Sequence, residues 1–144
     1  MIQLENVTKR FPGVIANNKV NFDVRAGEVH ALLGENGAGK STLVKMIYGL
    51  MKADSGTMLW DGKSVNIDSP KEARALGVGM VFQHFSLFDA LSVLENIAVG
   101  IDGEFNLKKL EQRIIQVSED YGLHIDPRMT IHDLSVGERQ RVEI

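Results

Sequence analysis

A short glycine-rich stretch constrains this chain more than any other feature of its sequence. Residues 34–42 read GENGAGKST and match the pattern G-x-x-x-x-G-K-[ST]. An apolar segment at 28–33 precedes the stretch, and apolar side chains at helical spacing follow it as far as Leu50. A glycine-rich loop between a strand and a helix presents main-chain N–H groups to phosphates. The sequence therefore predicts a nucleotide site in an α/β fold.

Each residue type in this loop has a chemical reason. Glycines permit positive φ and let the main chain approach phosphates without an intervening Cβ. The helix expected to begin near Gly39 adds free N–H groups and its positive dipole end. We expect Lys40 to reach the β- and γ-phosphates and the Ser41 hydroxyl to ligate Mg²⁺. The predicted phosphate-binding residues are Gly34, Glu35, Asn36, Gly37, Ala38, Gly39, Lys40, Ser41 and Thr42.

An accidental match and a guanine site are the two alternatives to consider for this loop. At average glycine usage the pattern arises by chance in about 1% of chains of this length, and the flanking strand and helix lower that figure. A guanine-binding enzyme would need an N-K-x-D element after the loop. The Asn18-Lys19 pair precedes the loop and continues as Val20-Asn21, so guanine specificity has no support.

Periodicity and turn residues predict an order of elements that changes character near residue 83. Strands and helices mix before this point, and helices dominate after it. The expected strands are 2–11, 18–25, 28–33 and 78–82, with a hairpin over 57–68 that turns at Asp61-Gly62. The expected helices follow the glycine loop and cover 70–76, 92–99 and 107–121.

Composition excludes several classes of function. The 144 residues suit one domain, and 16 Lys+Arg against 19 Asp+Glu give a net charge of −3. A nucleic-acid surface usually brings a basic excess, so we expect no nucleic-acid partner. The chain has no cysteine, which excludes disulfides and thiolate metal sites. We see neither a signal peptide nor the apolar run of about 20 residues that a membrane-spanning helix needs.

Four elements, in order along the whole chain, resemble the ATP-binding cassette (ABC) family. Phe11 ends the first strand just before Pro12-Gly13, and the glycine loop follows. Residues 81–83 (VFQ) are an apolar strand end closed by Gln83, and residues 134–140 (LSVGERQ) are similar to the family signature L-S-G-G-Q. The signature differs from the commonest form at Val136 and Glu138.

The resemblance implies a role for each element. Phe11 would stack on adenine, although strand-end packing is the simpler explanation for a single aromatic. Gln83 would lie near Mg²⁺ and the γ-phosphate. Ser135, Gly137 and Glu138 would contact the nucleotide bound to the opposite subunit. Independently of the family, Ser135 with Glu138 forms a capping-box pattern that predicts a helix start.

The form of the signature, together with residues 83–88 and 91–97, resembles the ATP-binding subunits of sugar- and nucleoside-type importers. The implied cofactors are ATP and Mg²⁺. The implied partners are a second cassette (as a dimer or a tandem domain), transmembrane permease subunits and a substrate-binding protein, with the protein peripheral on the cytoplasmic face of the membrane. The rival is a soluble ABC-type ATPase acting on nucleic acid or ribosomes, which should show basic arms that this stretch lacks.

The expected fold is α/β: a P-loop NTPase core with an antiparallel β subdomain at 1–83 and an α-helical subdomain at 84–144 that ends in the signature helix. In the family the Walker B strand and the catalytic Glu follow this helix, beyond Ile144. Residues 114–120 do not supply that strand, because their apolar positions belong to the helical stripe of 107–121.

Two expectations follow from this truncation, and a third, separate expectation concerns the last helix. The 144-residue stretch alone should hydrolyse ATP negligibly, and an unpaired central strand edge should make it associate. Arg139 and Arg141 are expected on a solvated face of the helix that follows Ser135.

Overall fold

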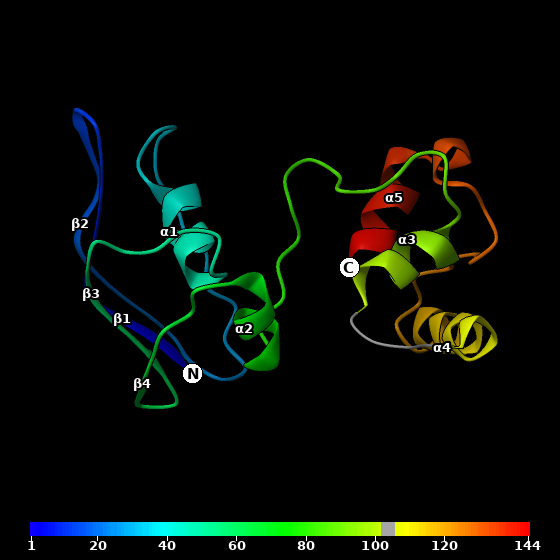
Figure 1. Cartoon of the computed structure of the whole chain (residues 1–144), viewed down its shortest axis with the longest axis horizontal. Helices are drawn as coiled ribbons and strands as arrows, with labels where there is room; N and C mark the ends of the chain where they lie inside the picture. Colours follow the sequence, from blue (N-terminus) through cyan, green and yellow to red (C-terminus); the bar gives the residue numbers. More distant parts are fainter. Residues whose placement is uncertain (102–105) are drawn as a thin grey trace. The chain divides into compact units, whose positions relative to one another are not determined.

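A long antiparallel hairpin opens the chain. In the computed structural model, which describes residues 1–101 and 106–144, β1 (Ile2–Phe11) pairs with β2 (Val14–Val24) (Figure 1). Leu4 lies opposite Phe22 and Val7 opposite Val20, so the apolar residues share one face. β2 begins at Val14, four residues before the predicted start, because the turn after Phe11 continues directly into strand pairing.

Two shorter strands complete an antiparallel sheet. β3 (Ser55–Trp60) pairs with β1, and β4 (Lys63–Val65) pairs with β3, giving the order β2-β1-β3-β4. The β3–β4 turn consists of Asp61 and Gly62, both with positive φ (49° and 75°). Such a pair forms the two-residue turn that matches strand twist. The predicted hairpin and the antiparallel character of this subdomain are confirmed.

Helix α1 (Lys40–Ile47) covers one face of this sheet. Its buried Leu43 and Met46 pack in one cluster with Leu4 and Val7 of β1. Helix α2 (Pro70–Ala75) begins with proline, as predicted, and the Ser69 hydroxyl accepts a hydrogen bond from the Glu72 amide. The apolar cluster under α1 therefore fixes the glycine loop to the sheet.

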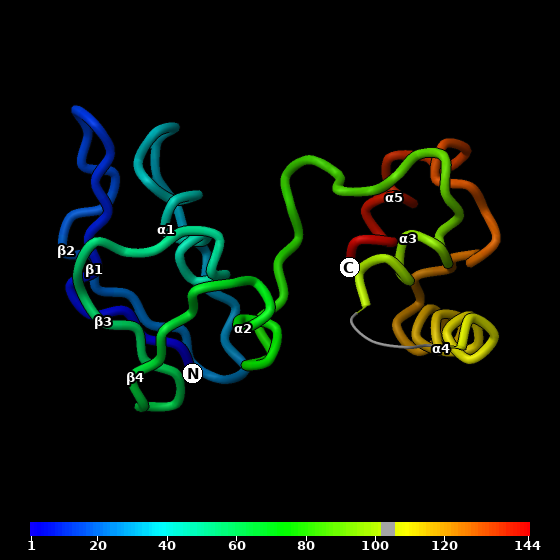
Figure 2. The backbone as a smooth tube through the Cα atoms, in the orientation of Figure 1, coloured from blue at the N-terminus to red at the C-terminus, as the bar shows by residue number. Residues whose placement is uncertain are grey.

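Two predicted strands, 28–33 and 78–82, are wrong. Neither stretch forms a strand, and Figure 2 shows the first as an irregular connection between β2 and α1. Val29 is 99% exposed and Leu33 is 86% exposed. Apolar composition favours a buried strand, but a strand also needs a neighbour for its main-chain hydrogen bonds. No described strand pairs with either stretch.

The chain divides into two units, Met1–Met80 and Val81–Ile144, and the regular elements described in the second are helical. These elements are α3 (Val93–Gly100), α4 (Leu107–Asp120), the short 3₁₀ helix η1 (Ile131–Asp133) and α5 (Val136–Glu143). The predicted helices 92–99 and 107–121 are confirmed. The assignment of functions to 1–83 and 84–144 stays a prediction.

The apolar stripe of α4 is only partly covered. Ile114 is buried, whereas Leu107 and Tyr121 at the two ends are exposed. Ser118, a polar residue of the same helix, is buried instead. Its hydroxyl accepts a hydrogen bond from the Ile125 amide at 2.7 Å. The helical conformation of 114–120 supports the decision not to interpret this segment as a Walker B strand.

Candidate nucleotide-binding site

The start of α1 is open to an anion. Gly39 is the N-cap, and no side chain caps this helix or places an acidic group in its first turn. Gly37 and Gly39 have φ values of 87° and 82°, which glycine adopts without a Cβ clash. The first N–H groups of a helix have no intrahelical acceptor, so the glycine loop leads into a set of free donors.

The position of this helix start is set by a close contact with β2. A Cβ on Gly39 would lie 2.1 Å from the carbonyl oxygen of Ala16 and 2.9 Å from Asn17 Nδ2. Asn17 is buried, and its Nδ2 donates a hydrogen bond to the Gly39 carbonyl oxygen at 3.3 Å. No sequence pattern indicated this role, because Asn17 lies one residue before the predicted strand 18–25 and 22 residues before Gly39.

The Lys40 side chain folds back over the loop. Its ammonium donates hydrogen bonds to the carbonyl oxygens of Gly34 and Glu35, each at 2.7 Å. The Ala38 amide donates to the same Glu35 oxygen at 3.2 Å, which closes the turn. A positive charge therefore lies within the loop that leads to the helix start.

These residues fit a polyphosphate with Mg²⁺. A Cβ on Gly37 would meet no atom within 4 Å, so the loop has open space at this point. The ammonium of Lys40 and the first-turn amides of α1 are donors, and the exposed Ser41 supplies a hydroxyl oxygen suited to Mg²⁺. Contact of the individual loop residues with nucleotide stays a prediction.

Phe11 and Gln83 are both exposed, but only Phe11 belongs to the unit that contains the loop. Phe11 is 40% exposed, and Lys9 Nζ lies 5.8 Å from the centroid of its ring. The ring is therefore available for stacking, although its contact with adenine stays a prediction. Gln83 lies in an irregular segment of the second unit, and its role near Mg²⁺ also stays a prediction.

The signature residues form the predicted capping box at the start of α5. Ser135 Oγ accepts a hydrogen bond from the Glu138 amide at 3.4 Å, and Glu138 Oε2 accepts from the Ser135 amide at 2.8 Å and hydroxyl at 2.6 Å. Hydrogen bonds from the Ser135 side chain and then its main chain lower the pKa of Glu138. Glu138 is therefore ionised at neutral pH, and Gly137 lies in the exposed first turn.

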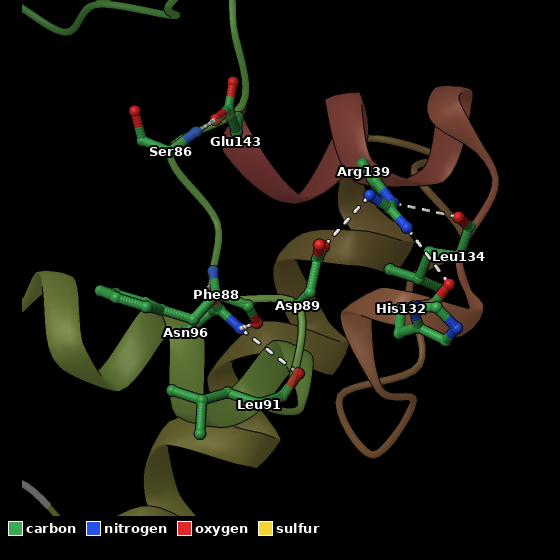
Figure 3. A network of polar contacts seen from close by, with 9 residues as sticks. All are labelled: Ser86, Phe88, Asp89, Leu91, Asn96, His132, Leu134, Arg139 and Glu143. Atoms are coloured by element: carbon green, nitrogen blue, oxygen red, sulfur yellow. Dashed lines mark hydrogen bonds and ion pairs between the residues drawn. The ribbon is translucent and has the colours of Figure 1, made fainter.

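The expectation that Arg139 lies on a solvated helix face is wrong. Its side chain is only 24% exposed, and it donates hydrogen bonds to the carbonyl oxygens of Leu134 and His132 and contacts Asp89 (Figure 3). Arg141, also expected there, is half-buried. Asp89 is 50 residues from Arg139, so no local pattern could have revealed the contact.

Comparison with known sequences and structures decides the family. The family model described as "ABC transporter" matches residues 17–144, which include the glycine loop and the signature. The chain belongs to the ABC transporter family. Almost all of this ABC chain is matched by solved cassettes, but it covers only part of their length. One match is to the ADP conformation of MJ1267, an ATP-binding cassette of an ABC transporter: 27% identity and a TM-score of 0.84 over 99% of this chain and 61% of that one.

Several curated sequence relatives of this ABC chain are named as import ATP-binding proteins. The chain is 50% identical over 148 residues to the nucleoside import ATP-binding protein NupA of Lactococcus lactis subsp. cremoris. It is 45% identical over 148 residues to the guanosine import ATP-binding protein NupO of Bacillus subtilis. All of this chain is covered in both cases, but it spans only 29% of the length of either relative. Among the described residues, no helix has the length and apolarity needed to cross a membrane.

Proposed function

We propose that this chain is the first part of an ATP-binding subunit that powers the import of nucleosides or sugars. The observation that carries the proposal is the 50% identity, over the whole chain, to a nucleoside import ATP-binding protein. A further relative, the ribose import ATP-binding protein RbsA 1 of Rubrobacter xylanophilus, is 44% identical over 148 residues, covering all of this chain and 30% of the relative. The two names support a substrate that contains a pentose or a related sugar.

The residues of the loop act by position and charge. Lys40 exchanges its two carbonyl contacts for phosphate oxygens, and the first-turn amides of α1 orient the same group. Ser41 would hold Mg²⁺, a role that the family resemblance also gives to Gln83, and Phe11 would support the base. Bound ATP–Mg supplies the phosphoryl group whose transfer to water provides the driving force. At the start of α5, Ser135 and Gly137 contact the nucleotide bound to a second cassette.

Such a subunit needs partners to do mechanical work. The second cassette completes each nucleotide site, and a solved relative, MJ0796, is described as a dimeric ABC transporter cassette (28% identity, TM-score 0.79). We propose that transmembrane permease subunits anchor the protein at the cytoplasmic face of the membrane, where a substrate-binding protein delivers the solute from the other side.

The 144-residue stretch alone should turn over ATP negligibly. It contains the groups assigned to the phosphates but not the carboxylate that orients the attacking water in this family. General-base catalysis contributes about 10²–10⁴-fold in rate. Turnover by the pure stretch close to that of the intact subunit would refute this assignment of the base.

The proposed site is tested by titrating ATP–Mg against Lys40→Ala. We expect binding to be lost, because the loop then has no cation to offset the phosphate charge. Lys45→Ala is the matched control, since Lys45 lies exposed on the same helix, outside the loop, and its variant should bind as the parent does. An unchanged affinity of Lys40→Ala for ATP–Mg would refute the proposal. Measuring the uptake of a nucleoside and of ribose by the intact transporter then distinguishes the two candidate substrates.

A further inference from the structure

The guanidinium of Arg139 joins separate segments of the second unit at one point (Figure 3). Its Nε donates a hydrogen bond to the Leu134 carbonyl oxygen, and its Nη2 donates to the His132 carbonyl oxygen, each at 3.1 Å. Its Nη1 lies 3.1 Å from Asp89 Oδ1. Leu134 and His132 precede the signature helix, whereas Asp89 belongs to the loop that follows Gln83. The side chain of Arg139, a residue of α5, therefore contacts both segments.

Main-chain hydrogen bonds bring the same two segments together. The His132 amide donates to the Asp89 carbonyl oxygen, and the Ile131 amide donates to the Leu91 carbonyl oxygen, both at 3.0 Å. Ile131 is fully buried. The loop after Gln83 thus already lies against the approach to α5, and Arg139 adds a charged donor to this junction.

The three contacts of Arg139 differ in strength. The Asp89 side chain is 64% exposed, and a solvent-exposed ion pair contributes little because water screens it. The two bonds to carbonyl oxygens come from a charged donor on a side chain that is only 24% exposed, so they are the stronger contacts. The main effect of Arg139 therefore falls on the peptide groups immediately before Ser135.

Those peptide groups determine how α5 begins. Ser135 is the N-cap, and Val136 and Gly137 carry amides of the first turn, which an α-helix leaves without an intrahelical acceptor. The helix dipole opposes a cation near this end. The guanidinium stays near this end because it is bonded to the two carbonyl oxygens. The same two bonds fix the main chain that leads into the first turn.

We propose that Arg139 is a positioning residue for the signature turn: it fixes the main chain before Ser135 so that the first amides of α5 face the nucleotide on a second cassette. This rests on the proposed function, because it assumes that the turn meets a nucleotide. Asp89 contributes a weaker link from the loop after Gln83 to the same junction.

Amide hydrogen exchange on the full-length protein, without nucleotide, tests the positioning itself. In Arg139→Ala we expect exchange of amides 131–137 to rise by about tenfold or more, because two charge-assisted bonds are lost. Arg139→Lys should restore only part of the protection, since an ammonium lacks the planar fork. Arg128→Ala is the control: it removes another arginine ion pair of this unit, the 2.7 Å contact with Glu111 of α4, and leaves the three contacts of Arg139 in place. Unchanged exchange at 131–137 in both Arg139 variants would overturn the proposal.

Association of cassettes in the full-length protein tests the link to nucleotide. Arg139→Lys should leave the affinity of a single cassette for ATP–Mg unchanged, but raise the ATP concentration for half-maximal association of two cassettes several-fold. Asp89→Ala should change that concentration about two- to threefold at most. Equal association curves for parent and Arg139→Lys would overturn the inference. If the parent bound no ATP, the proposed function would fail, and the exchange experiment would decide the role of Arg139.

Discussion

The main chain of Gly39 packs against that of Ala16 so closely that a Cβ at position 39 would lie 2.1 Å from the Ala16 carbonyl oxygen. Two segments more than 20 residues apart thus meet at the point where the phosphate-binding helix begins. Backbone rather than a flexible side chain blocks the Cβ, so the contact cannot relax without moving β2 or α1.

Gly39→Ala should destabilise the first unit by about 4 kcal/mol or more, since strain at positive φ adds to the clash. Gly37→Ala is the matched control, because Gly37 has a similar φ of 87° and open space around its missing Cβ. It should cost only about 1–2 kcal/mol from the positive φ. Urea unfolding followed by the fluorescence of Trp60, the single tryptophan, measures both. Equal losses would show that the contact with Ala16 is not tight.

Asn17 permits a prediction that separates shape from polarity. Its Oδ1 is buried and has no hydrogen-bond partner among the described residues, while its Nδ2 makes one long bond to Gly39. Asn17→Leu removes both the bond and the unsatisfied oxygen, so we expect a change within about 1 kcal/mol. Asn17→Asp puts a charge in the same place and should cost about 3 kcal/mol or more. Urea unfolding followed by Trp60 fluorescence again measures both changes in stability. Equal losses of stability in Asn17→Leu and Asn17→Asp would contradict the prediction.

Stability should fall in acid through Asp54. Its carboxylate accepts hydrogen bonds from Lys9 Nζ at 2.9 Å and the Arg10 amide at 2.6 Å, and these two contacts, the first the larger, lower the pKa of Asp54 below 3.8. A lowered folded-state pKa stabilises the fold above the unfolded value, and this contribution disappears as pH falls through the folded value.

Asp54→Asn should therefore be less stable than the parent at neutral pH, with a difference that shrinks below about pH 4. Urea unfolding at a series of pH values measures it. Asp23→Asn, at an exposed position on β2, is the control and should track the parent. A difference that stayed constant down to the lowest pH would exclude the Lys9–Asp54 contact as its source.

The isolated 144-residue chain should associate through its exposed apolar stretch. Val29 and Leu33 are almost fully exposed, and the main chain around them is not paired in a described strand. Such a segment invites intermolecular pairing. Val29→Asp should reduce the apparent mass in light scattering, whereas Val14→Asp, at another exposed valine, but one that β1 already pairs, should not. A monomeric parent chain would contradict this prediction.

Short-range patterns predicted the local features well. The Asp61-Gly62 turn, the proline start of α2 and the Ser135–Glu138 capping box all depend on residues a few positions apart. Periodicity failed at 28–33 and 78–82, because strand formation also depends on a distant neighbour that composition does not reveal.

The sequence by itself determined the glycine loop, the helix starts, the antiparallel hairpins and the family resemblance, since each is encoded within a few consecutive residues. Tertiary structure alone decided that Asn17 and Ala16 support Gly39, and that Arg139 joins His132, Leu134 and Asp89. Such contacts depend on how distant segments pack, and a polar residue in a strand or helix looks the same in sequence whether it faces water or a carbonyl oxygen.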